Sequence, residues 1–202
     1  MPKVSEKHLA ARKQQIFSAA TRQFSRRGFH QTSIQDICDE AGLSAGAVYR
    51  YFKNKEDLIT QIAQENRQRN LTLVDEIDRA ESAREKMRRL VETFFGMLDK
   101  DGCPVRMDIE LWAEALSNPR IMRIVRQSLN GHHAAFTRIV EQGQRDGEIR
   151  PDIKPEAMAR VMISMFTGLL LQKGLLGEVE TWDYVDVLNA MNEAVFTAFA
   201  AR

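Results

Sequence analysis

The sequence predicts an all-α fold of about nine helices, in which a small N-terminal domain of three helices precedes a larger helical body. Two observations favour this class. Apolar residues recur at spacings of three and four, and no segment alternates with the period of two that strands show. Residues 3–103 contain no proline, and several expected helices approach 20 residues, a length typical of helix bundles.

The first helix is expected over about residues 9–27. Arg26 and Arg27 suit the negative C-terminal end of a helix. Gly28 follows at the position where a helix commonly ends in a left-handed residue, which glycine adopts without steric cost. The buried face of this helix is predicted to consist of Ile16, Phe17, Ala20 and Phe24.

The second and third helices are short and lie within residues 32–52. Thr32 and Gln35 have the spacing of a capping box, which predicts that the second helix begins at Thr32. Gly42 ends it. Ser44 is a good N-cap for a third helix that runs to about Phe52. The predicted core of this region consists of Ile34, Ile37, Cys38, Leu43, Val48 and Phe52.

The remaining helices form the body. Asn54 is the expected N-cap of the fourth helix, which runs to about Ala80, and Glu56 and Asp57 suit its first turn. Glycine and proline between the later apolar stripes mark the breaks. Five further helices are expected over about residues 83–98, 105–116, 120–144, 155–175 and 184–200.

Composition and charge limit the class of protein. The longest uncharged run, residues 161–172, is shorter than the roughly 20 residues of a membrane span, and the charged start does not resemble a signal peptide. Two isolated cysteines fit a reducing cytoplasm. Residues 1–55 hold ten Lys and Arg against four Asp and Glu, a net charge of +6, whereas the rest holds 19 against 24, a net −5. This asymmetry indicates that the N-terminal part meets a polyanion.

Residues 32–52 have the pattern of a helix-turn-helix, two short helices joined by a tight turn that contains Gly42. The face of the third helix opposite its core is small, aromatic and basic. Small side chains let a helix approach base edges, and an arginine such as Arg50 can pair with guanine. Tyrosine hydroxyls and lysines reach phosphates. A plain αα-hairpin in a larger bundle has the same spacing, so the pattern alone leaves both possibilities open.

The run from Gly42 to Leu58, with Gly28-Phe29 and Thr32-Ser33-Ile34 before it, resembles the signature of the TetR family of transcriptional repressors. The likeness is close over about residues 10–60, and helix number and length agree over the rest. The resemblance implies a DNA-binding domain over residues 1–54 and an effector-binding and dimerisation domain over residues 55–202. The implied partners are a palindromic double-stranded DNA operator, a small-molecule effector and a second copy of the chain, with no membrane.

The family's DNA contacts can be transferred position by position. The resemblance assigns phosphate contacts to the start of the second helix and to the end of the third. It assigns base-edge positions to the exposed face of the third helix. The base-edge set is Ala45, Gly46, Ala47 and Arg50, and the phosphate set is Thr32, Ser33, Ser44, Tyr49, Tyr51 and Lys55.

The body is rich in Phe, Met and Leu, and most such residues at helical spacing belong to an ordinary core. The resemblance implies that some of them line a pocket for a largely apolar effector with one polar or cationic group. The carboxylates of Asp108, Glu110 and Glu114 could select a cation there or could simply be solvated. The predicted pocket set is Phe94, Met97, Met107, Leu111, Trp112, Phe136, Met165 and Phe166.

A dimer interface is expected on the last two helices. The stretch 162–171 is apolar nearly all round, so it must be covered on every side. A second copy of the chain could cover it, as the resemblance implies, or it could be intramolecular core. The predicted interface set is Gly168, Leu188, Val195, Phe196 and Phe199.

Two alternatives to a ligand-responsive repressor stay open. One is a ligand-independent DNA-binding protein of the same fold. The other is a serine hydrolase, because residues 42–46 match the GxSxG motif of a nucleophile elbow, although that chemistry needs a strand before the serine and no strand pattern precedes it. We expect no enzyme activity, no catalytic residue, no metal and no cofactor.

Overall fold

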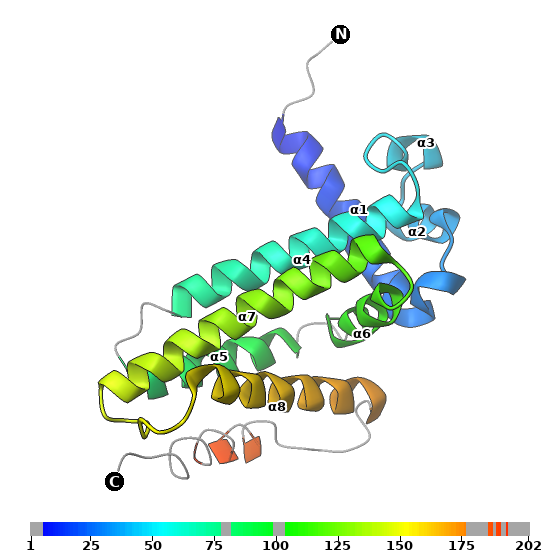
Figure 1. The fold of residues 1–202 in the computed structure, drawn as a ribbon. Coiled ribbons are helices and arrows are strands. Elements are labelled where there is room, and N and C mark those ends of the chain that lie inside the picture. The colour runs from blue at the N-terminus through cyan, green and yellow to red at the C-terminus, as the bar shows by residue number, and fades with distance from the viewer. Residues whose placement is uncertain are drawn as a thin grey trace. The chain divides into compact units, whose positions relative to one another are not determined.

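The computed structural model describes residues 6–77, 82–98, 104–176 and the isolated positions 186, 187, 189, 190 and 193. The regular structure of these residues is entirely helical (Figure 1), which confirms the predicted class. The expected ninth helix, residues 184–200, falls outside the described part apart from those isolated positions.

Eight helices are described, and most begin and end within a few residues of the predicted limits. The largest differences are four residues: the first helix continues through a kink at Gly28 to Gln31 instead of ending at about Arg27, and the third ends at Val48 instead of about Phe52. The helices are α1 (Glu6–Gln31), α2 (Ile34–Ala41), α3 (Ala45–Val48), α4 (Lys55–Ile77), α5 (Ala83–Leu98), α6 (Pro104–Ala115), α7 (Pro119–Arg145) and α8 (Pro155–Leu176).

The first compact unit consists of residues 1–66 and 106–124. Here α1 packs against α2, and α2 against α3. The ring centroids of Phe17 and Phe52 lie 5.5 Å apart, and those of Phe24 and Phe29 lie 4.7 Å apart. The predicted α1 face is buried in full, whereas Ile34 and Leu43 of the predicted core are only half-buried. The fully buried members of that core are Ile37, Cys38, Val48 and Phe52.

Two predicted boundaries in this unit are wrong by a few residues. The capping box is formed by Ser33 and Asp36, not by Thr32 and Gln35, so the N-cap lies one residue later than predicted and α2 begins at Ile34. The reason is that the Thr32 hydroxyl is buried and donates to the Gly28 carbonyl at 2.8 Å. In addition, α3 ends at Val48, and residues 49–51 form turns before Phe52.

The second compact unit consists of residues 67–105 and 125–202. The rings of Phe136 on α7 and Phe166 on α8 lie 5.6 Å apart and belong to its core. Gly143 permits a close approach near the end of α7, because an added Cβ would lie 2.8 Å from Ile149 Cδ1 and 3.1 Å from Ala83 Cβ. The His133 ring contacts the Glu156 carbonyl at 3.0 Å, which ties α7 to the first turn of α8.

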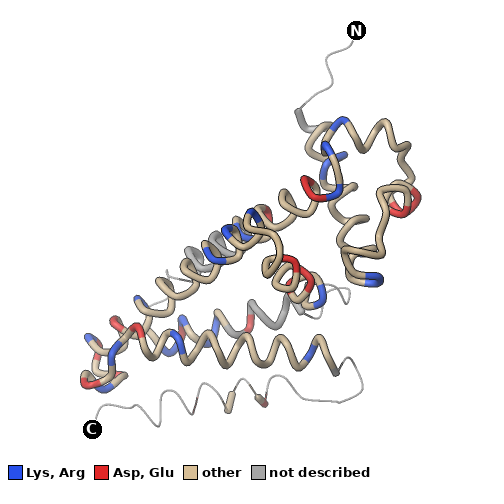
Figure 2. The backbone as a smooth tube through the Cα atoms, turned by 45° about the vertical axis from the view of Figure 1, so that its right-hand side comes forward, with Lys and Arg blue, Asp and Glu red and all other residues tan. Residues whose placement is uncertain are grey.

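The two faces of α8 differ in burial. Met158, Met162, Phe166 and Leu170 are buried and define the inner face. The opposite face carries side chains that remain exposed, and charged residues are sparse along the helix (Figure 2). No helix in the described part of the chain combines the length and the apolar character that a bilayer crossing needs.

Candidate DNA-binding site

The candidate site is built by the turn between α2 and α3. Gly42 has φ +63° and ψ +36°, a left-handed conformation that glycine adopts without steric cost, and its amide donates to the Asp39 carbonyl at 3.2 Å. The Leu43 amide donates to the Cys38 carbonyl at 3.0 Å. Ser44 then caps α3 by accepting a hydrogen bond from the Ala47 amide at 3.3 Å. Local hydrogen bonds therefore set the direction in which α3 leaves α2.

The exposed face of α3 carries the side chains predicted to meet DNA bases. Gly46 is exposed, and an added Cβ there would meet no atom within 4 Å. Ala45 and Ala47 are half-buried beside it. Arg50 is exposed in the turn after α3 and, among the described residues, makes no hydrogen bond or ion pair. This surface is open enough for another molecule to approach the backbone.

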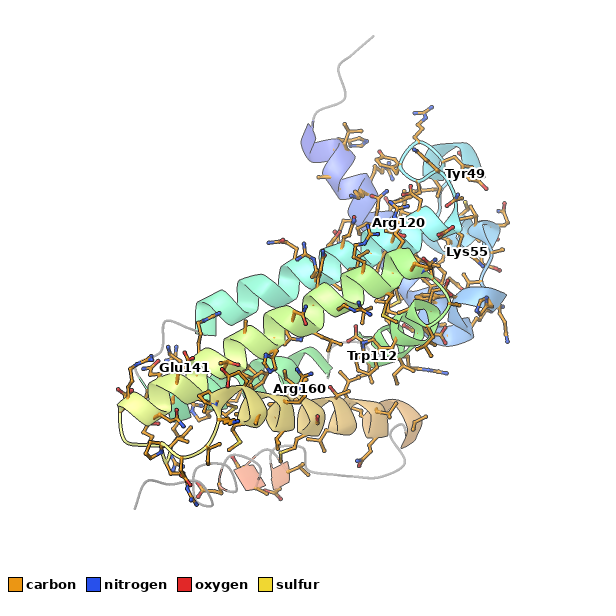
Figure 3. The ribbon with its side chains drawn as sticks, in the orientation of Figure 1. Tyr49, Lys55, Trp112, Arg120, Glu141 and Arg160 are labelled. Carbon is orange, nitrogen blue, oxygen red and sulfur yellow. The ribbon has the colours of Figure 1, made fainter. Side chains whose placement is uncertain are left out.

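Tyrosines and lysines flank this face. Tyr49 is 54% exposed at the end of α3 (Figure 3). Tyr51 is half-buried, with its ring centroid 6.3 Å from that of Phe52. Lys53 is exposed, and its ammonium has no partner among the residues that the structure describes. These groups are of the types that reach phosphates.

Three arginines of α1, Arg22, Arg26 and Arg27, are arranged differently, because acids of α2 pair with them. Arg22 Nε lies 2.6 Å from Glu40 Oε1, and Arg27 Nη1 lies 3.1 Å from Asp36 Oδ1. The hydrogen bond from Arg22 lowers the pKa of Glu40. Hydrogen bonds from Ser33, with a smaller contribution from Arg27, lower the pKa of Asp36. Part of the basic excess is thus compensated along α1, whereas the charges of Arg50 and Lys53 are not.

Lys55, at the start of α4, holds the junction of α1 and α2 from inside. Its ammonium donates to the carbonyls of Phe29 at 2.8 Å and Thr32 at 3.1 Å. Two of its three donors are therefore occupied. Thr32, predicted to contact phosphate, turns its side chain inward, whereas Ser33 is exposed.

The acids of α6 separate into two groups that sequence reasoning did not distinguish. Glu110 Oε2 accepts a hydrogen bond from the Phe29 amide at 3.1 Å, and Glu114 Oε2 lies 3.8 Å from His30 Nε2. Asp108 is half-buried and has no hydrogen-bond or ion-pair partner in the described structure. Desolvation raises the pKa of Asp108 to about 7. No local pattern could have signalled the Glu110 contact, because its partner is 81 residues away.

Most of the predicted pocket residues are buried. Met107, Leu111, Phe136 and Phe166 are at most 6% exposed, and Trp112 and Met165 are half-buried. The side chains of Phe94 and Met97 lie outside the described part of the chain. On α7, His132 is half-buried, and desolvation lowers its pKa.

The predicted interface residues are described only in part. Gly168 lies on the outer face of α8, where an added Cβ would meet nothing within 4 Å. On the same face Val161, Leu171 and Leu175 are 50%, 40% and 72% exposed. Leu188, Val195, Phe196 and Phe199 lie outside the described residues.

The nucleophile-elbow alternative is wrong. Ser44 follows the helix α2, whereas the elbow needs a strand before its serine. Its hydroxyl caps α3.

Comparisons with known proteins agree with this geometry. Residues 16–62 match the profile of the family described as bacterial regulatory proteins, tetR family, and residues 83–196, more than half of the chain, match the C-terminal part of BetI-type transcriptional repressors. The chain is 28% identical over 191 residues to the HTH-type transcriptional regulator UidR of Escherichia coli K12, covering 91% of this chain and 92% of that one. It is also 28% identical over 151 residues to the fatty acid metabolism regulator protein of Bacillus subtilis, covering 74% and 76%.

Two solved structures show the same fold. A putative transcriptional regulator from Saccharomonospora viridis in complex with choline has a TM-score of 0.84 at 23% identity, covering 96% of this chain and all of that one. The transcriptional regulator FadR from Bacillus subtilis in complex with stearoyl-CoA has a TM-score of 0.77 at 23% identity, covering 92% and 98%.

Proposed function

The chain belongs to the TetR family of bacterial transcriptional regulators, and from this premise we propose that it is a repressor that binds a palindromic operator as a dimer and releases it when a small effector binds. The observation that carries the proposal is the exposed face of α3 and the turn after it. Its charged side chains, Arg50 and Lys53, have no partner in the described part of the protein, whereas Arg22, Arg26 and Arg27 of α1 pair with acids of α2.

In this proposal the small residues and one arginine meet the bases. Gly46, with Ala45 and Ala47 beside it, lets α3 enter the major groove closely, and Arg50 pairs with a guanine in each half-site. The third donor of Lys55 binds a phosphate. Thr32 contributes through the turn that it orders, because its hydroxyl is already bonded inside. The remaining phosphate contacts are made by Ser33, Ser44, Tyr49 and Tyr51.

The proposed dimer is supported by the outer face of α8. Val161, Leu171 and Leu175 lie with Gly168 on one side of that helix, at the spacing of a helix–helix seam, and the apolar side chains are exposed. A second copy of the chain would cover this face, together with the predicted contacts at Leu188, Val195, Phe196 and Phe199. Two reading helices would then enter successive major grooves about 34–36 Å apart.

The proposed effector carries a positive charge on an apolar body. Met107 and Leu111 supply buried apolar surface on α6, and the half-buried Asp108 between them in sequence has no partner in the described part of the protein. A bound cation would stabilise the ionised form of this carboxylate. An acyl-CoA carries several negative charges, which an ionised Asp108 would repel. Asp108 therefore favours a quaternary ammonium compound over a CoA thioester.

The DNA-binding proposal is tested by selecting duplexes from a random library with the purified protein. We expect the selected sequences to be palindromic, with one dimer bound per site in sedimentation experiments. Binding of all duplexes with equal affinity would contradict sequence-specific repression. A selected site without two-fold symmetry would contradict the dimer.

The effector proposal is tested on Trp182→Phe protein, in which Trp112 is the remaining indole. Choline and tetraalkylammonium ions of increasing chain length are titrated, with stearoyl-CoA as the anionic comparison. We expect a cation to change Trp112 emission and to release the selected duplex over the same concentration range. If only stearoyl-CoA released the DNA, the cationic assignment would be wrong. If no compound of a broad panel released DNA or raised the melting temperature, the ligand-independent alternative would be favoured.

A further inference from the structure

The junction between α1 and α2 is interrupted at Gly28, which has φ +76° and ψ 168° inside a stretch that is otherwise helical. This conformation breaks the regular ladder of backbone hydrogen bonds, so the following amide needs an acceptor from elsewhere. Phe29 provides that amide, and its ring is only 2% exposed. The junction also leads directly into Ser33, the N-cap of α2.

Both the amide and the carbonyl group of Phe29 are hydrogen-bonded by side chains from other helices. Its amide donates to Glu110 Oε2 on α6 at 3.1 Å, and its carbonyl accepts from Lys55 Nζ on α4 at 2.8 Å. Lys55 also bonds the Thr32 carbonyl at 3.1 Å, and the Thr32 hydroxyl bonds the Gly28 carbonyl at 2.8 Å. The turn that starts α2 is therefore held by side chains from two other helices.

Glu110 also lies directly against Gly28. A Cβ added at Gly28 would lie 3.0 Å from Glu110 Oε1 and 3.2 Å from Oε2, closer than carboxylate oxygens normally tolerate. The absence of a side chain at Gly28 therefore leaves space for this carboxylate, and it also allows the positive φ. Two requirements at one glycine point to a contact that the fold is built to accommodate.

We infer that Glu110 is a positioning residue for DNA binding, which holds the Phe29 peptide so that α2, and through it α3, present their DNA-facing side chains in the bound geometry. The inference rests on the proposed DNA-binding function. It runs against simple electrostatics, because any carboxylate on the DNA-binding unit reduces its attraction to a polyanion. A positioning role and a mere surface charge therefore predict changes of opposite sign when Glu110 is removed.

The test compares Glu110→Ala, Glu110→Gln and the matched control Glu114→Ala, one helical turn along α6, whose carboxylate lies 3.8 Å from the exposed His30. The probe is the duplex selected by the wild-type protein. We expect Glu110→Ala to weaken binding by roughly 10- to 150-fold, the range of one lost hydrogen bond to a charged group. Glu110→Gln keeps an oxygen acceptor and should stay within about two-fold of wild type. Glu114→Ala should bind unchanged or more tightly.

Hydrogen exchange separates positioning from general destabilisation. The Phe29 amide should exchange faster in Glu110→Ala and remain protected in Glu110→Gln, while amides in the middle of α1 exchange as in the wild type. Unchanged or tighter DNA binding by Glu110→Ala, or an unchanged Phe29 amide, would overturn the inference. The exchange measurement needs no DNA, so its outcome stands even if the wild type selects no duplex, a result that would overturn only the proposed function.

Gly28→Ala provides a second route if Glu110→Ala does not fold. It should expose the Phe29 amide to exchange and weaken DNA binding, because an L residue at φ +76° is strained and the new Cβ crowds the Glu110 carboxylate. In Gly28→Ala/Glu110→Gln, the amide group still meets the Cβ, so no affinity should be regained. If Gly28→Ala and Glu110→Ala both fold, the double variant should lose less affinity than the product of the two single fold-changes, because the new Cβ no longer crowds a carboxylate. Full multiplicativity would assign the Gly28→Ala effect to backbone strain alone, and the exchange of the Phe29 amide in Glu110→Ala would then decide the inference.

Discussion

The helix-turn-helix segment and α8 differ in the kind of side chain that they leave exposed without a partner. In residues 32–57 the caps are local: Ser33 bonds Asp36, Ser44 bonds Ala47 and Asn54 bonds Asp57. The core beneath them is closed, and what remains without a partner is charged. Along α8 the inner face is closed too, but the exposed side chains include the apolar Val161, Leu171 and Leu175.

This difference indicates two kinds of missing partner. Exposed charges such as Arg50 are stable in water and attract a polyanion without requiring one. An exposed apolar seam such as the one around Gly168 costs free energy in water, so it favours permanent cover. Residues 32–57 thus cover their apolar core within a single chain, whereas the outer face of α8 is expected to be covered only in a pair. The four predictions below test that contrast.

The largest effect is expected from Gly168→Trp. An added Cβ at Gly168 meets no described atom within 4 Å, so we expect the subunit still to fold. In a dimer the indole would force the two α8 helices apart. We expect a monomer in sedimentation experiments and a loss of operator affinity of at least about 100-fold, because one reading head makes half of the contacts.

Leu116→Trp is the control for Gly168→Trp, since Leu116 is 84% exposed outside α8. It should remain dimeric and bind normally. A Gly168→Trp dimer of wild-type affinity would mean that this face of α8 is not the interface.

The next effect is expected from Arg50→Ala. Loss of a bidentate guanine contact should lower operator affinity by roughly 1–3 kcal/mol per half-site and relax the preference at one or two base pairs. The measurement is fluorescence anisotropy with the selected duplex and with single-base variants of it. Unchanged base preference would show that Arg50 does not read sequence. Melting temperature should not change, because Arg50 has no partner within the described structure.

Asp108 is an exception to the paired acids of the first unit, and its titration should affect stability. Its pKa is raised from 3.8 to about 7, so the folded protein binds more protons than the unfolded chain between these values. The contribution of this group to stability is therefore greatest below pH 4 and decreases as the pH rises to about 7. Asp108→Asn should be more stable than wild type by roughly 1–2 kcal/mol at pH 8, and the difference should shrink towards pH 4. Denaturant unfolding at both pH values measures this; parallel stability curves would contradict a desolvated carboxylate.

The smallest effect is expected from Arg22→Ala. Its ion pair with Glu40 is partly exposed, and such pairs contribute at most about 1 kcal/mol to stability. Operator affinity should fall only slightly, by the loss of one remote positive charge. An effect as large as that of Arg50→Ala would remove the distinction between paired and unpaired arginines.

Local patterns predicted much of the first unit. Residues of the α1 stripe are buried as expected, Ser44 and Asn54 are the caps that their types suggest, and Gly28 and Gly42 have positive φ. Such features depend on groups three or four residues apart, which a single sequence displays directly. The capping box was misplaced by one residue because Thr32 and Ser33 are both competent caps, and burial decides between them.

The site shows where such reasoning ends. Sequence and family likeness named the residues on α3, because a short helix between two caps has a definite outer face. They did not separate Asp108, Glu110 and Glu114, which follow one another on α6 and share one chemistry. Because α6 packs against α1, the Glu110 carboxylate accepts a hydrogen bond from the Phe29 amide and the Glu114 carboxylate lies near His30. Asp108 makes no such contact in the described structure.

The sequence by itself determined the helical class, the caps at Ser44 and Asn54 and the start of α3, because each depends on propensities and hydrogen bonds within about one turn. Only the tertiary structure decided that Lys55 and Glu110 hold the Phe29 peptide, with partners 26 and 81 residues away. It also decided which face of the nearly uniformly apolar α8 is exposed. A helix that is apolar on all sides carries no periodic signal, so its inner face is chosen by the neighbours that pack against it.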